Sequence, residues 1–264
     1  MKFRVLSDLH IDVNRYHTDL FNWKNKDILT VIAGDVSGSI QLTAPFLRKR
    51  FKNVIFIGGN HIVYNDDYKP LQQLHQDYRT EFPLASTISY LENEKKEIDD
   101  VVFIGATLWT DYTYYNSRAE NMMYAAIAMN DFRFGRFEEN GADVQLQPQH
   151  CLDMFNESLS FIKTTYDKFV GTGKKIVLVV HHGVSPKAIT GRYIQNTKIN
   201  AAYTSDLEDY ITRELPCLAL IVHGHVHTRV QYQIGSIPVV CNPCGYIDYD
   251  EEAPAWRKNL IVEI

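Results

Sequence analysis

The sequence lacks the features that mark membrane proteins and proteins that coat nucleic acids. It has no apolar run long enough to span a membrane, which argues against a transmembrane helix. A strand-like run, residues 3–6, starts almost at Met1, so we expect no signal peptide and a cytoplasmic location. Basic residues are not in excess, because 27 Lys and Arg stand against 32 Asp and Glu. The net charge of −5 therefore predicts no broad electrostatic contact with nucleic acid.

Cysteine is also scarce. The four cysteines, Cys151, Cys217, Cys241 and Cys244, suggest no disulfide framework. Cys241 and Cys244 have the spacing of a zinc knuckle, but a structural zinc site needs about four ligands and no second pair is present. We therefore interpret residues 239–246 as a strand that runs into a turn.

Five short apolar runs, in contrast, each end in side chains of the kind that bind metals. The runs are residues 3–6, 30–33, 54–57, 175–180 and 218–222. Asp8 and His10 follow the first run two positions apart, so in extended geometry they face one way and can reach a single cation. One such pair is more often part of a solvated loop than a metal site. Side chains that can bind metal follow each of the five runs, however, and this recurrence favours a metal site.

The other four runs end in Gly34-Asp35, Gly59-Asn60-His61, His181-His182-Gly183 and Gly224-His225-Val226-His227. If the five strands share a sheet, these side chains gather at its carboxyl edge, where α/β proteins bind ligands. His182 and His223 adjoin the candidates, but neighbours in a strand face opposite sides, so we interpret both as buried histidines without metal. His17, His75 and His150 lie in polar stretches and are expected at the surface.

In this order the motifs closely resemble those of the calcineurin-like metallophosphoesterase family, from Asp8 to His227. The segment Asn242-Pro243-Cys244-Gly245-Tyr246 is similar to one in bacterial and phage-type members. The resemblance implies an α/β fold in which a two-sheet β-sandwich is flanked by helices, giving four layers, α/β/β/α. It also implies two divalent metal ions, for which the mixed N and O ligands suit Mn, Fe, Zn or Ni, with Mn expected in vitro.

The resemblance also assigns roles. Asp35 would bridge the two ions, while His61 would act as the catalytic residue beside them, stabilising phosphoryl oxygens or protonating the leaving group. Asn60 and His61 would contact substrate. The remaining ligands would be Asp8, His10 and His227 for the first ion and Asn60, His181 and His225 for the second.

These roles predict a metal-dependent phosphoesterase that attacks its substrate with a metal-bound hydroxide at a dinuclear centre. We expect a small phosphate-ester substrate, a nucleotide-like phosphodiester or a phosphomonoester. A nuclease acting on DNA or RNA is one alternative, although it would need a cationic groove. A catalytically weak binding scaffold on the same fold is another. Only Ile62 favours the scaffold, because the family usually has an acid at that position and this chain then leaves His61 without an acidic partner unless Asp66 or Asp67 supplies one.

The chain order predicts a single domain, 1–264, with an insertion at about 108–149. Helices are expected at 44–51, capped by Thr43, and at 70–80, 152–170 and 205–214. Further strands are expected at 101–104 and around residues 230, 239 and 260–262, and a long loop at 184–203. The insertion is rich in aromatic residues and is either a cover for a sheet edge or a cap over the site. Within it, Arg133 is our candidate for a phosphate contact, because a guanidinium offers bidentate hydrogen bonds.

Overall fold

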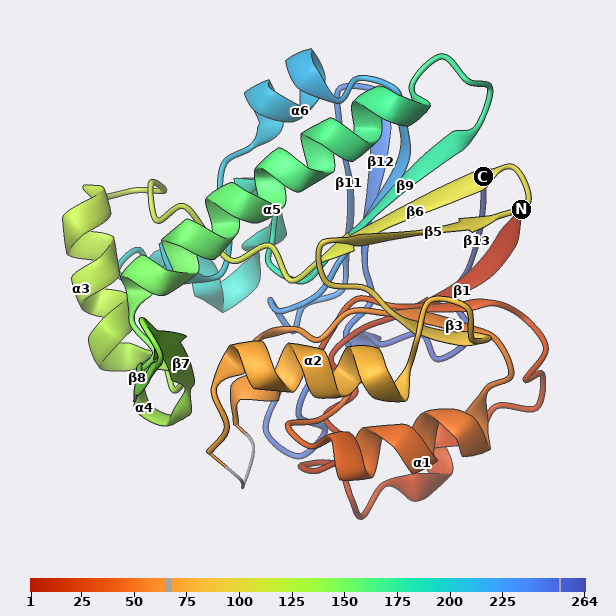
Figure 1. Ribbon diagram of the computed structural model, residues 1–264, viewed down its shortest axis with the longest axis horizontal. Coiled ribbons are helices and arrows are strands. Elements are labelled where there is room, and N and C mark those ends of the chain that lie inside the picture. The colour runs from red at the N-terminus through yellow and green to blue at the C-terminus, as the bar shows by residue number, and fades with distance from the viewer. Residues whose placement is uncertain (65–67, 252) are drawn as a thin grey trace.

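Two β-sheets pack face to face, with helices on both outer sides (Figure 1). The structure is a computed structural model that describes residues 1–64, 68–251 and 253–264. One sheet has the order β13-β1-β2-β3-β4, and the other has the order β11-β12-β10-β9-β6-β5. The predicted α/β sandwich, with helices outside both sheets, is confirmed.

Parallel pairing dominates both sheets. The first contains β1 (Lys2–Leu6), β2 (Thr30–Ile32), β3 (Val54–Phe56), β4 (Ile88–Tyr90) and β13 (Ile261–Glu263). The second contains β5 (Glu94–Ile98), β6 (Val101–Ala106), β9 (Lys175–Val180), β10 (Leu218–His223), β11 (Val230–Ile234) and β12 (Ile237–Cys241). Within the described part of these two sheets, the antiparallel pairs are those of β13, β5 and β11, which form sheet edges. β7 and β8 form a separate antiparallel pair. The parallel strands therefore deliver their carboxyl ends to the same side of the molecule.

Alternating side chains explain why both faces of each sheet are covered. Phe3 and Val5 of β1 pack between the sheets against residues such as Phe103 and Val177, whereas Leu6 lies in the other core cluster, which includes residues of the helices. Successive residues of a strand point to opposite faces, so a strand that is apolar at almost every position needs an apolar layer on each side.

The helices supply the outer layers (Figure 1). α1 (Ile40–Arg50) and α2 (Leu71–Glu81) cover the five-stranded sheet, and α5 (Pro148–Phe169) and α6 (Glu208–Glu214) lie on the side of the six-stranded sheet. Between β6 and α5 the chain forms α3 (Arg118–Ala128), α4 (Asp131–Phe134), β7 (Arg136–Glu139) and β8 (Ala142–Gln145). The short 3-10 helices are η1 (Thr18–Phe21), η2 (Asn60–Val63), η3 (Pro186–Ala188), η4 (Gly191–Gln195), η5 (Asn200–Ala202) and η6 (Ala253–Ala255). Across the described residues, no helix is both long and apolar enough to cross a membrane.

Several sequence-based boundaries were wrong. The first helix begins at Ile40 with Ser39 as its N-cap, so Thr43 is not the cap and Pro45 lies inside the helix. α6 begins only at Glu208, because the Ser205 hydroxyl instead accepts a hydrogen bond from the Asp111 N–H. The expected loop at 184–203 contains η3, η4 and η5.

Two histidines expected at the surface are also not there. His150 is 9% exposed, and its Nδ1 accepts the N–H of Gln147 at the start of α5. His75 is partly buried, and its Nδ1 lies 2.7 Å from the Tyr90 hydroxyl. Polar neighbours in the sequence did not reveal these contacts. His17 is 30% exposed and pairs with Asp248.

Candidate metal centre and its cavity

Carboxyl ends of strands from both sheets bring the predicted site residues together. Asp8 and His10 follow β1, Asp35 follows β2, and Asn60 and His61 follow β3, all in the five-stranded sheet. His181 follows β9, and His225 and His227 follow β10, in the six-stranded sheet. The expectation that one sheet carries all these residues was wrong, because the site lies where the ends of two packed sheets meet.

Three groups of side chains in the described chain have the geometry of a metal site, with ligand atoms within 4.8 Å of one another. One group is Asp8, His10 and His227, and another is Asp35, His181 and His225; the third is His10, Asp35 and His61. The first two match the two predicted ligand sets, and the third joins them through His10 and Asp35. The seven predicted ligands therefore form one continuous cluster once Asn60 is added, whose Oδ1 lies 2.9 Å from His181 Nε2.

Both carboxylates are oriented by backbone N–H groups. Asp35 Oδ1 accepts the N–H of His61 at 3.0 Å, and Asp8 Oδ1 accepts the N–H of His225 at 2.9 Å. The second oxygen of each, Oδ2, is buried and accepts no hydrogen bond from the described residues. A buried carboxylate oxygen without a donor is unfavourable unless a cation binds it. This arrangement fits two carboxylates that each present one oxygen to a metal ion.

The imidazoles fit a cation in the same way. His181 Nδ1 faces the Ala33 carbonyl at 2.8 Å and is therefore the protonated nitrogen, while Nε2 faces both Asn60 Oδ1 and Asp35 Oδ2, the latter at 3.2 Å. Two acceptors around Nε2 favour a positive charge there, which can be the proton of an imidazolium or a metal ion. His10 Nε2 and His227 Nε2 likewise lie 2.9 Å apart. His225 Nε2 is buried without a partner among the described residues.

Some titratable groups of the cluster are charged and paired, and others are held neutral. Burial raises the pKa of Asp35, but the neighbouring His181 and His61 outweigh it and hold this pKa well below its usual range. Burial lowers the pKa of His181, but Asp35 outweighs it and raises this pKa to about 9. Burial, reinforced by neighbouring imidazoles, holds the pKa values of His10 and His225 well below the usual value. Neutral imidazoles and an ionised carboxylate are the forms that bind transition metals.

The backbone at the site is strained. Five of the predicted ligands have positive φ although none is glycine: Asp8 (51°), His10 (41°), Asp35 (55°), His225 (68°) and His227 (50°). Non-glycine residues adopt this region rarely and at a cost of roughly 1–3 kcal/mol each. Gly34 and Gly59 leave room for two site residues that approach their backbone closely. A Cβ on Gly34 would lie 2.2 Å from His181 Nδ1, and one on Gly59 would lie 2.1 Å from Asp35 Oδ1. Such strain concentrates at functional sites.

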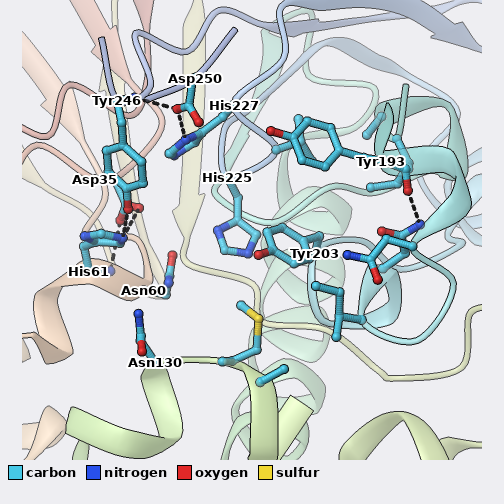
Figure 2. A pocket seen from close by; sticks show the side chains of 18 of the residues that line it. Asp35, Asn60, His61, Asn130, Tyr193, Tyr203, His225, His227, Tyr246 and Asp250 are labelled. Atoms are coloured by element: carbon cyan, nitrogen blue, oxygen red, sulfur yellow. Dashed lines mark hydrogen bonds and ion pairs between the residues drawn. The ribbon is translucent and has the colours of Figure 1, made fainter. Parts of the chain in front are cut away.

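Two residues near the C-terminus, not predicted from the sequence, complete the site. Asp250 Oδ2 accepts a hydrogen bond from His227 Nδ1 at 2.7 Å and another from the Tyr246 N–H at 2.6 Å. The Tyr246 hydroxyl lies 3.1 Å from His61 Nε2. Figure 2 shows Tyr246 and Asp250 side by side at the same end of the cavity as His61 and His227. A carboxylate behind a metal-binding histidine fixes its tautomer and ring orientation.

Asp131, at the start of α4, supports the other side of the cluster. Its Oδ1 accepts a hydrogen bond from Asn60 Nδ2 at 2.8 Å, and its Oδ2 accepts one from the Tyr64 hydroxyl at 3.0 Å. Because the amide nitrogen of Asn60 is held there, its Oδ1 must face His181. The insertion between β6 and α5 thus reaches the site through Asp131.

Ile62 belongs to the apolar core. Its side chain is 1% exposed and packs in the apolar core, so it does not leave a vacancy beside His61. His61 has a neighbour in the Tyr246 hydroxyl instead. A tyrosine hydroxyl is not an acidic partner, so the expectation that His61 lacks one unless Asp66 or Asp67 supplies it stays a prediction. Asp66 and Asp67, the proposed substitutes, lie outside the described residues.

A cavity of about 290 Å³ opens from the cluster (Figure 2). One end is lined by Asp35, Asn60, His61, His225, His227, Tyr246 and Asp250, and the other by residues 128–130 after α3 and by side chains between 188 and 203. Arg133 is not among the lining residues. It is exposed, with its guanidinium 5.4 Å from the Phe134 ring centre, because Asp131 and Phe132 form the buried side of α4. Its expected phosphate contact has no support in this geometry.

The remaining candidates lie outside the cluster. His182 is buried against Trp109 and His225, and His223 lies 3.1 Å from the Tyr232 hydroxyl. Both are buried, and neither is in any of the three metal-type groups found among the described residues. The four cysteines are free, and none belongs to such a group in the described chain.

Comparisons with known proteins find a related sequence and similar folds. The uncharacterized protein L509 of Acanthamoeba polyphaga mimivirus is 23% identical over 267 residues, which cover 92% of this chain and 90% of that protein. The phosphopantetheinyl hydrolase PptH of Mycobacterium tuberculosis has a similar fold, with a TM-score of 0.72, 17% identity and coverage of 96% of this chain and 94% of that one. A dimetal phosphatase from Danio rerio has a TM-score of 0.57 and 12% identity, covering 95% and 89%.

A family model described as calcineurin-like phosphoesterase matches residues 1–229, which include every predicted metal ligand but neither Tyr246 nor Asp250. The chain therefore belongs to the calcineurin-like phosphoesterase family, whose members are hydrolases that act on phosphate esters.

Proposed function

We propose that this protein hydrolyses a small phosphate ester, either a phosphomonoester or a phosphodiester, at a centre of two divalent cations. The observation that carries the proposal is the sharing of Asp35. Its Oδ2 is buried without a hydrogen-bond donor among the described residues, and it lies between the His181 side and the His10 side of the cluster, 3.2 Å and 3.8 Å from their Nε2 atoms. The name of the Danio rerio neighbour, a dimetal phosphatase, agrees with this proposal.

Two bound cations would supply a clamp for the phosphoryl group, an activated water and compensation for charge on the leaving oxygen. Asp8, His10 and His227 would hold the first, Asn60, His181 and His225 the second, and Asp35 both. The set of N and O ligands suits Mn, Fe, Zn or Ni. Asp250 keeps the Nε2 of His227 directed at the cluster, and Asp131 does the same for Asn60 Oδ1.

His61 has a role different from that of the metal ligands. It lines the cavity with 12% of its side chain exposed, and its Nε2 lies 3.8 Å from Asp35 Oδ2. From that position it can donate a hydrogen bond to a phosphoryl oxygen or a proton to the leaving oxygen. The Tyr246 hydroxyl lies 3.1 Å from this nitrogen and helps to hold the ring.

The test compares p-nitrophenyl phosphate with bis(p-nitrophenyl) phosphate, with the purified protein in Mn²⁺ and after chelation. We expect metal-dependent release of p-nitrophenol from at least one ester. Removing a residue that only supports a metal ligand lowers activity by about 10–100-fold. Asp35→Asn replaces the shared, charged carboxylate by a neutral amide with a single oxygen, so it should lower kcat/KM by more than about 100-fold. Asp27→Asn is the matched control, because Asp27 is an exposed aspartate that pairs only with surface groups.

Activity that is equal with and without chelator, or an Asp35→Asn variant as active as Asp27→Asn, would contradict the proposal.

A further inference from the structure

The cavity continues well beyond the metal-type cluster. Its second end has two walls, one formed by Ala128, Met129 and Asn130 and the other by the loop from Ala188 to Tyr203. Figure 2 shows this end around Tyr193 and Tyr203, away from Asp35 and His61. We call this end the arm. Nothing in the proposed chemistry uses it, so its lining should reflect what the substrate carries besides phosphate.

The two walls are joined, so the arm is preformed. Asn116 Nδ2 donates to the Thr197 carbonyl at 3.0 Å, which ties the loop to the segment before α3. The ammonium of Lys198 lies 5.6 Å from the ring centre of Tyr124 in α3. Lys198 thus contacts α3 and is not among the residues that line the cavity.

The described side chains of the arm are uncharged. Ile189, Met129 and Ile199 provide apolar contacts, Tyr193 and Tyr203 provide aromatic ones, and Tyr203 stacks on His225 with ring centres 4.7 Å apart. Among the cavity-lining side chains that the structure describes, none is Lys or Arg, and the only carboxylates, Asp35 and Asp250, lie at the other end. A second phosphate or a carboxylate in the arm would find no described cation to pair with, and burying an unpaired charge is costly.

The polar groups of the arm are amides and a hydroxyl. Asn200 is 2% exposed, and its Nδ2 donates to the Tyr193 carbonyl at 2.9 Å. Its Oδ1 accepts no hydrogen bond from a described residue, and Asn200 lines the cavity, so this oxygen can accept an N–H from a ligand. Asn130, Thr190 and Asn196 also line the arm. Carboxamides match the donor and acceptor pattern of another amide.

We infer that the arm binds the organic group of the ester, and that this group is uncharged and carries amide-type N–H and C=O groups. The inference rests on the proposed function. Two sources offer that chemistry, an acyclic amide chain and the amide edge of a nucleobase. A volume of about 290 Å³ lies at the small end of ligand pockets, which favours a small molecule over a polymer.

The experiment measures kcat/KM of the metal-loaded protein on one series of alcohols, each offered as a phosphomonoester and as its p-nitrophenyl diester. The series is ethanol, N-acetylethanolamine, ethanolamine as the cation, glycolate as the anion and uridine. One good hydrogen bond to an amide is worth about tenfold, so the N-acetylethanolamine or uridine ester should exceed the ethyl ester by about tenfold or more. The larger of these two gains identifies the source, while the charged esters should be no better than the ethyl ester.

Variants of the arm test whether it causes the preference for amide-bearing esters. Tyr193→Ala should lower the preference for the amide-bearing ester over the ethyl ester by about tenfold, since it removes an aromatic wall. Ile194→Ala is the matched control, because Ile194 is the next residue of η4, is 46% exposed and does not line the cavity. Its preference should match that of the unmodified protein.

The inference is overturned if a charged ester is preferred, if amide-bearing esters are no better than ethyl esters, or if both variants change the preference equally. If the unmodified protein hydrolysed none of the esters in a metal-dependent way, the proposed function would instead be refuted.

Discussion

Asp250 offers a specific test of the site, because it lies outside the family match and contacts the metal ligand His227. Its Oδ2 lies 2.7 Å from His227 Nδ1, and its side chain is 11% exposed. Burial lowers the pKa of His227, but the hydrogen bond that the ring donates to Asp250, together with the charges of Asp8, Asp250 and Asp35, outweighs burial and raises this pKa. The ring is therefore a more basic ligand. Charge-assisted hydrogen bonds contribute about 1.5–3 kcal/mol, so Asp250→Ala should weaken metal binding by about 10–100-fold.

Asp248, two residues before Asp250, provides a matched control. Asp248 also pairs with a histidine, His17, at 2.9 Å, but its side chain is 60% exposed. Because exposed pairs contribute about 0–1 kcal/mol, Asp248→Ala should change metal affinity by less than about fivefold. Asp250→Asn keeps an acceptor oxygen but loses the charge, so its effect should fall between those of the two alanine variants.

Metal affinity is measured by calorimetric titration of Mn²⁺ into metal-free protein, with thermal unfolding as a check that each variant is folded. The reasoning is refuted if folded Asp250→Ala binds Mn²⁺ as tightly as Asp248→Ala.

Three other substitutions have definite expected outcomes. Tyr246→Phe removes the hydroxyl beside His61, which should lower kcat about fivefold at unchanged metal content, measured by steady-state kinetics with elemental analysis. Ile62→Glu buries a carboxylate in the core and should lower the free energy of unfolding by more than about 3 kcal/mol in urea titrations; a stable variant would mean that residue 62 can turn toward the site. Burial lowers the pKa of His75 to about 3, below its usual 6.5, so folding excludes a proton that the unfolded chain binds. Stability should therefore fall as the pH drops below 6.5, by about 2 kcal/mol between pH 7 and pH 5, and His75→Gln should remove that part of the slope.

The metal-type cluster could be predicted because its signal is local. Asp35, for example, follows β2 after Ala33 and Gly34, and the carboxyl ends of parallel strands meet on one side of a sheet. The same logic missed β5, Glu94–Ile98, because four of its five residues are charged and it pairs only along one edge. An edge strand that is half exposed carries no apolar run.

Other features had no local signal, or one that was overlooked. Tyr246 meets His61 across 185 positions, and no pattern in the sequence reports such a contact. The positive φ of Asp8 and His10 is equally invisible, since both are non-glycine residues. α3, by contrast, begins with a capping box of Ser117 and Glu120. This pattern predicts the start of a helix, but we overlooked it because the surrounding stretch is dominated by aromatic residues.

The central claim is that Asp35 joins two metal sites. The most direct measurement is an anomalous difference map at the manganese absorption edge from crystals grown with Mn²⁺. We predict two peaks, one beside Asp8, His10 and His227 and one beside Asn60, His181 and His225, with Asp35 in contact with both. A single peak, or two peaks of which only one contacts Asp35, would contradict the claim.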